Sequence, residues 1–139
     1  MGSYKDITTF STPMLVKSLS TLQISAGEDN GEWDAQFPQG VAIFVPEGEY
    51  FTVRIESFGT IPSDKKLAAM NAINATNGNL AFGKVVPNLI EGRRTIVFRN
   101  HFNFTQGVSQ FQLDTLIDAS LHVGFNALGK IEELFEGME

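Results

Sequence analysis

One short stretch of this sequence changes its hydrophobic period from that of a helix to that of a strand. Leu67, Met70 and Ile73 are spaced to share one helix face, because residues three and four apart lie on the same side of a helix. Gly78 is expected to end this helix in a left-handed backbone conformation. Residues 80–86 then alternate as in a strand. A helix followed so closely by a strand predicts a mixed α+β chain.

Two further helices and several strands complete the predicted pattern. Thr12-Pro13 indicates a helix start, since a hydroxyl can cap the helix and proline suits its first turn. Ser109 with Gln112 three residues later forms a capping box at the start of the last helix. That helix contains Gly124 and Gly129, where we expect a kink or fraying. The remaining elements are a helix over residues 12–24, a loop over 25–31, strands over 32–37, 41–45 and 50–58, and a strand over 95–104 after a turn near Glu91-Gly92.

This order, α-β-β-β-α-β-β-α, predicts an α+β fold in two layers, with an antiparallel sheet and its helices packed on one face. A length of 139 residues suits a single domain over residues 1–139, with a core of about residues 12–136. The run over 41–45 lacks alternation. We therefore expect it to be a middle strand, or to have its second face covered by another chain.

Charge and composition limit the classes of partner. The net charge is −6, with 10 basic and 16 acidic residues, which argues against nucleic acid as a partner because such binding neutralises phosphates with cations. There is no cysteine, as is common in a reducing compartment. We find neither an apolar signal segment nor a run long enough to cross a membrane. These features predict a cytoplasmic protein with no membrane association.

A family resemblance is carried by the central helix and the strand after it. The helix contains Asn71 and Asn74, and residues 80–84 read Leu-x-Phe-Gly-Lys. Together with the element order and the acidic character, this motif resembles the bacterial YbjN family, whose fold is similar to that of the class I chaperones of type III secretion. The resemblance covers about residues 12–136. It implies a chaperone-like fold, a homodimer and a regulatory or partner-binding role with no established catalysis.

Catalytic motifs are scarce. The sequence contains no nucleophile elbow, phosphate-binding loop or dinucleotide fingerprint. Asp114, Asp118 and His122 lie at i, i+4 and i+8 on the last helix, so neighbouring members could share a cation or a proton. His101 is expected to be an exposed or hydrogen-bonded strand residue.

We therefore predict a non-catalytic protein-binding module, a homodimer that holds a partner protein of unknown identity and needs no cofactor. The alternative is a small-ligand or metal-binding protein, or an enzyme, that uses the polar face of the last helix. A structural subunit of a larger assembly is a third possibility. One predicted contact surface is the open edge of the first three strands, where an added strand would satisfy unpaired backbone groups. The other contains Leu67, Met70, Asn71, Asn74, Phe82 and Val86.

Overall fold

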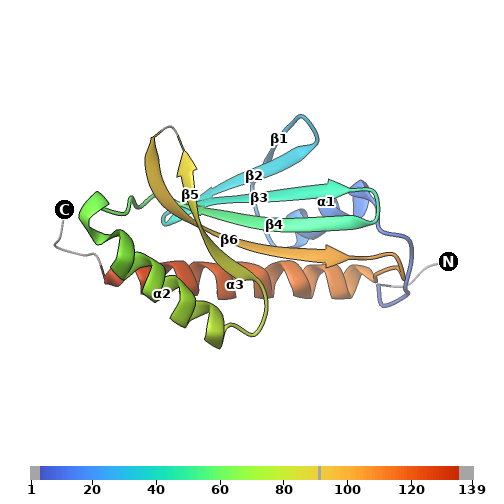
Figure 1. Ribbon diagram of the computed structural model, residues 1–139. Helices are drawn as coiled ribbons and strands as arrows, with labels where there is room; N and C mark the ends of the chain where they lie inside the picture. The colour runs from blue at the N-terminus through green and yellow to red at the C-terminus, as the bar shows by residue number, and fades with distance from the viewer. Residues whose placement is uncertain (1–3, 91, 135–139) are drawn as a thin grey trace.

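The computed structural model describes residues 4–90 and 92–134. Within these residues, no helix has the length and apolar character needed to cross a membrane. The elements, drawn in Figure 1, are α1 (Thr12–Thr21), β1 (Gly27–Asp29), β2 (Glu32–Phe37), β3 (Gly40–Glu47), β4 (Tyr50–Ser57), a 3₁₀ turn (Ser63–Lys65), α2 (Lys66–Asn79), β5 (Lys84–Ile90), β6 (Arg93–Asn103) and α3 (Gln110–Glu133).

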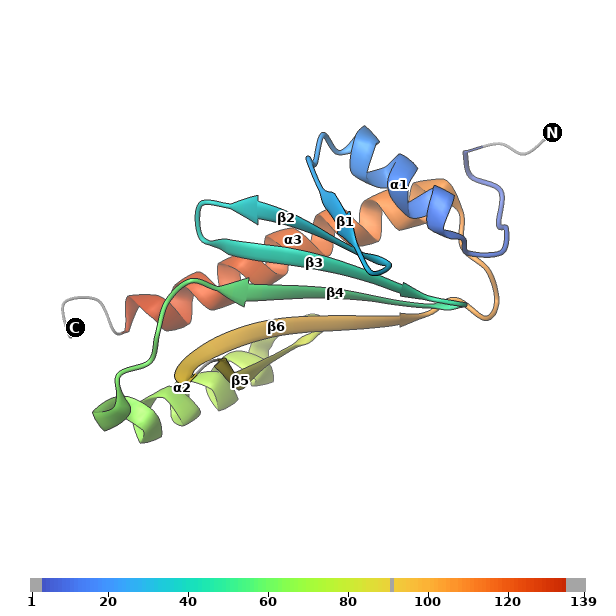
Figure 2. The same cartoon turned by 90° about the horizontal axis from the view of Figure 1, so that it is seen from above.

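The strands form one antiparallel sheet in the order β1-β2-β3-β4-β6-β5. The helices lie on one side of this sheet, with α3 running along β4 and β6 and α2 lying beside β5 (Figures 1 and 2). No helix of the described residues covers the opposite side, which we call the helix-free face. This arrangement confirms the predicted two-layer α+β fold.

The strand β1 is an addition to the predicted order, which becomes α-β-β-β-β-α-β-β-α. Its hairpin with β2 turns at Asn30 and Gly31, whose φ angles are 52° and 82°. Asn-Gly is the preferred pair for a two-residue turn of this kind, because both positions need positive φ. The prediction of a loop throughout residues 25–31 was therefore wrong for the three residues of β1.

The middle strands supply the centre of the core. Phe51, Val53 and Ile55 of β4 point toward the helices and are fully buried, while the residues between them are partly exposed. The strand β3 lies between β2 and β4. This position confirms the prediction of a middle strand for residues 41–45.

The junction after α2 differs from the prediction. The helix continues through Gly78 to Asn79, and the strand begins at Lys84 rather than at Leu80. The glycine with a positive φ is Gly83, at 77°, where an added Cβ would lie 2.5 Å from the ring of Phe98. The turn is delayed because β5 must enter the sheet in register with β6.

The ends of several other elements also differ from the prediction. The first helix has Ser11 at its cap position, not Thr12, and ends at Thr21. Of the predicted hairpin turn, Gly92 has the positive φ that a turn requires, and Glu91 lies outside the described residues. The last two residues of the predicted core, 135 and 136, also lie outside the described residues.

The last helix begins with the predicted capping box. The side chain of Ser109 accepts a hydrogen bond from the backbone N–H of Gln112, and the Gln112 side chain accepts one from the Ser109 N–H, at 3.0 and 2.9 Å. Its buried face includes Leu113, whereas Phe111 and Leu134 are exposed.

The two glycines of α3 have different surroundings, although the helix is unbroken at both. At Gly124 an added Cβ would lie 2.5 Å from Cδ1 of Ile55 and 2.6 Å from Cδ2 of Phe98. Gly129 has nothing within 4 Å of the same position. The glycine at 124 therefore allows the helix backbone to approach the sheet closely.

We predict that Gly124→Ala lowers the free energy of unfolding by about 1–3 kcal/mol, because overpacking exceeds the gain in helix propensity. The matched control Gly129→Ala should raise it by roughly 0.5–1 kcal/mol, since only the propensity changes. Urea unfolding followed by circular dichroism measures both. Equal effects at the two positions would contradict the close packing of Gly124.

Candidate functional site

The residues predicted to form a contact surface are divided between two sides of the molecule. Leu67 and Met70 lie on the outward side of α2, where their side chains are 76% and 37% exposed. Asn71 and Asn74 are exposed on the same helix. Val86 pairs with Val97 and points to the helix-free face.

An apolar groove lies between α2 and the β5–β6 hairpin. It has a volume of about 340 Å³, and Leu89, which is 68% exposed, forms part of its wall. The two charged residues of the lining, Lys66 and Arg94, are both cations. The lining consists of Ile61, Lys66, Ala69, Met70, Ile73, Pro87, Asn88, Leu89 and Arg94.

The groove therefore includes Met70 from the predicted set, with Leu67 nearby on the same helix, and adds Leu89, which the prediction missed. Phe82 is half-buried in the connection between α2 and β5. It and the two exposed asparagines are absent from the groove lining. The alternating pattern of β5 continues beyond Val86 and could have indicated Leu89. The strand was predicted to end at Val86, so Leu89 was missed.

The side chain of Asn77 connects α2 to the edge strand β5 by hydrogen bonds. Asn77 accepts a hydrogen bond from the backbone N–H of Val85 at 2.7 Å and donates one to the Val85 carbonyl at 2.9 Å. The amide thus takes the place of a neighbouring strand's backbone. Two residues further along, Pro87 has no N–H to offer. This combination blocks strand addition at the first half of β5, as edge strands often require.

The predicted open edge at β2 is also covered. β1 pairs with Glu32, Trp33 and Asp34 of β2, and Trp33 and Asp34 pair with β3 as well, so these two residues have a strand on both sides. The new edge is three residues long and carries Glu28 and Asp29. The prediction that the first three strands present an open edge is therefore wrong over this part of β2.

The three polar residues of the alternative prediction are not assembled into one site. Asp118 and His122 are exposed, and Oδ1 of Asp118 lies 3.8 Å from Nε2 of His122. Asp114 is instead buried against α1, where it accepts hydrogen bonds from Ser18 and from Tyr4, the latter at 2.6 Å. Within the parts of the chain that the structure describes, no three His, Cys, Asp or Glu side chains are placed to hold a metal ion.

The buried carboxylate joins the N-terminal segment, α1 and α3. Besides Tyr4 and Ser18, Gln110 donates a hydrogen bond to Asp114 at 3.3 Å. The hydrogen bond to the carboxylate, with smaller effects of burial and charge, raises the pKa of the Tyr4 hydroxyl above its usual value. The periodicity of α3 alone therefore did not indicate that Asp114 is buried and hydrogen-bonded to other segments of the chain.

The sequence and the structure were compared with known proteins. No protein-family model and no curated protein matches the sequence. The six-stranded antiparallel sheet with helices on one side defines the class as an open two-layer α+β sandwich.

Within that class, the fold is YbjN-like. The structure is similar to YbjN from E. coli, with a TM-score of 0.72 and 14% identity over 84% of this chain and 87% of YbjN. It is also similar to an uncharacterised protein from Methanothermobacter thermautotrophicus, with a TM-score of 0.63 and 12% identity over 91% of this chain and 99% of that protein. The likeness confirms the fold that the sequence motif implied.

We predict that Asn77→Ala lowers the free energy of unfolding by about 1–3 kcal/mol, because it leaves two backbone groups of the buried Val85 without partners. Thermal or urea unfolding measures the change.

The matched control is Asn74→Ala on the exposed side of α2, which should change stability by no more than about 0.5 kcal/mol. If the two variants are equally stable, the Asn77 side chain does not hold α2 to the sheet.

Proposed function

We propose that this protein is a non-catalytic protein-binding module, a homodimer that holds a partner protein. The observation that carries the proposal is the apolar groove beside α2, with Met70 and Leu89 exposed in its lining and Leu67 exposed three residues before Met70 on α2. Large apolar side chains gathered on a surface are typical of contact sites. The YbjN of E. coli is described as a proposed transcription regulator, which is consistent with a binding role.

The charges of the groove favour a particular kind of partner segment. Lys66 and Arg94 form no ion pair with any described residue. A segment with apolar side chains flanked by a carboxylate, supplied by the second copy of the chain or by the partner protein, would fill the groove and pair with these cations. A regulatory or chaperone-like role and a cytoplasmic location remain part of the proposal, the latter resting on the cysteine-free sequence.

Two exposed leucines allow a test that leaves the core intact. We expect the wild-type protein to have a mass near twice 15.3 kDa by light scattering, with the fraction of dimer rising with concentration. The double variant Leu67→Glu, Leu89→Glu should shift toward the monomer mass, because charge in an apolar contact is costly.

The matched control is Val16→Glu on α1, whose side chain is 45% exposed and lies away from the groove. It should keep the wild-type mass and affinity for a bound partner. A monomeric wild type at every concentration would contradict the homodimer. Unchanged dimer and partner binding in the double variant would contradict the groove as the contact surface.

A further inference from the structure

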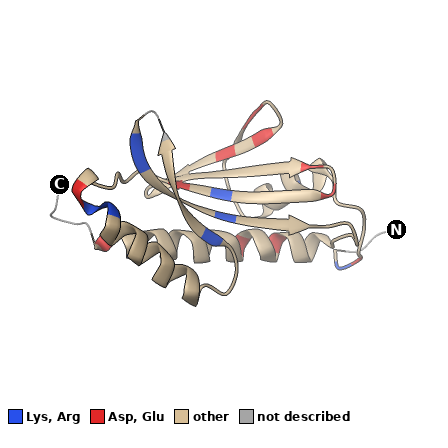
Figure 3. Ribbon diagram, viewed as in Figure 1, with Lys and Arg blue, Asp and Glu red and all other residues tan. Residues whose placement is uncertain are grey.

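Three neighbouring strands place one cation each in a single row on the helix-free face. Lys84 of β5 pairs with Arg99 of β6, and Arg99 pairs with Arg54 of β4. Directly paired residues of antiparallel strands point to the same face. The adjacent Val85 and Phe98 are buried toward the helices, so the three cations point away from them. Figure 3 shows the corresponding bands of Lys and Arg on these strands.

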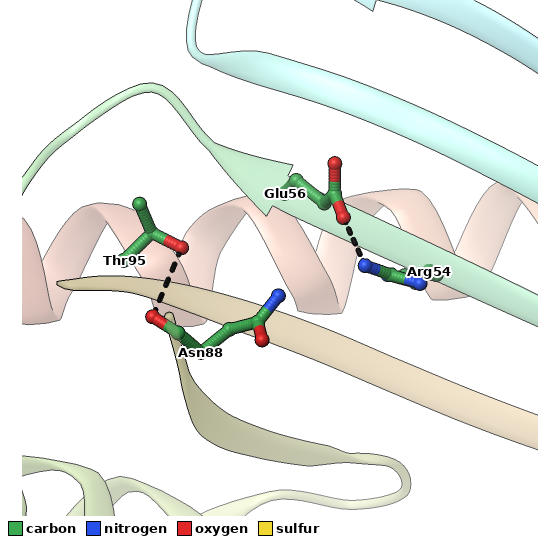
Figure 4. Close-up of polar contacts among 4 residues, drawn as sticks. All are labelled: Arg54, Glu56, Asn88 and Thr95. Carbon is green, nitrogen blue, oxygen red and sulfur yellow. Dashed lines mark hydrogen bonds and ion pairs between the residues drawn. The ribbon is translucent and has the colours of Figure 1, made fainter. Parts of the chain in front are cut away.

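One of these cations is neutralised and two are not. Arg54 forms an ion pair with Glu56 on its own strand (Figure 4). Lys84 and Arg99 have no ion pair among the described residues. Like charges placed directly opposite each other on antiparallel strands are destabilising. The free protein therefore retains an unfavourable charge pair that an anion would relieve.

The same two cations line a shallow hollow of about 510 Å³, together with Thr52, Gly83 and His101. No carboxylate belongs to this lining. The hollow thus combines an ammonium group and a guanidinium group, which can donate hydrogen bonds to an anion, with a hydroxyl and an imidazole.

The imidazole is held in place from two directions. Its Nδ1 lies 2.8 Å from the Thr52 hydroxyl, and its ring stacks on Tyr50 with centroids 5.6 Å apart and planes at 16°. When Thr52 donates to Nδ1, the neutral ring carries its proton on Nε2. His101 can then donate from Nε2 without a change of charge.

We propose that this hollow binds a phosphate dianion, as inorganic phosphate or as a small phosphate monoester. Two unpaired cations match a charge of about −2 better than that of a carboxylate, and the arginine fork suits phosphate oxygens. An extended nucleic acid strand is disfavoured, because the β1–β2 hairpin of the same sheet bears acidic residues and no basic ones (Figure 3). This site is separate from the groove of the proposed function.

The test is a titration of the ¹⁵N-labelled protein with sodium phosphate, compared with sodium acetate at equal ionic strength. We expect phosphate to give saturable shifts centred on Lys84, Arg99 and His101, and acetate to bind more weakly. Arg99→Gln should weaken phosphate binding roughly tenfold or more. The same variant should not lower Tm, because it removes an unfavourable charge pair.

Lys17→Gln on the exposed surface of α1 is the matched control, since it changes the net charge equally and should leave phosphate binding intact. Equal weakening in both variants, unsaturable shifts, or equal binding of acetate would overturn the proposal. A phosphoserine peptide and a sugar phosphate then distinguish the source, and tighter binding of either one identifies the carrier of the phosphate. Tighter binding of a single-stranded oligonucleotide would overturn the small-ligand site.

Discussion

The packing of α3 across β4 and β6 is the constraint on which the rest of the structure depends. Gly124 has no side chain, and the space beside it is occupied by Ile55 and Phe98 of these two strands. β4 and β6 are neighbours in the sheet, although α2 and β5 lie between them in the sequence. β5 must therefore pair on the far side of β6 and become an edge strand, with α2 beside it.

This one-sided arrangement gives the molecule two different surfaces. On the helical side, α2 and the hairpin form an apolar groove with Lys66 and Arg94 in its lining. On the helix-free face, Lys84 and Arg99 line a polar hollow. Asn77 closes the outer edge of β5 with its amide and leaves both faces of the strand available.

Much of the fold could be predicted from periodicity and capping, as the alternation in β4 and the capping box at Ser109 illustrate. The rest depended on tertiary contacts. The choice of Gly83 over Gly78 for the left-handed conformation follows from the register of β5 with β6. Asp114 was grouped with its polar neighbours on α3, but contacts to α1 and to Tyr4 determine its environment. The groove was predicted only in part: Met70 was named, but Leu89 was missed because the strand was predicted to end at Val86.

The central claim is that α2 and the β5–β6 hairpin form the contact surface of a homodimer. Amide hydrogen exchange, followed by mass spectrometry as the protein concentration is raised, tests this claim most directly. The account predicts that exchange slows in α2, β5 and β6, while α1 and the β1–β2 hairpin stay unchanged. Slowing confined to α1 or to the β1–β2 hairpin, or no slowing at any concentration, would contradict it.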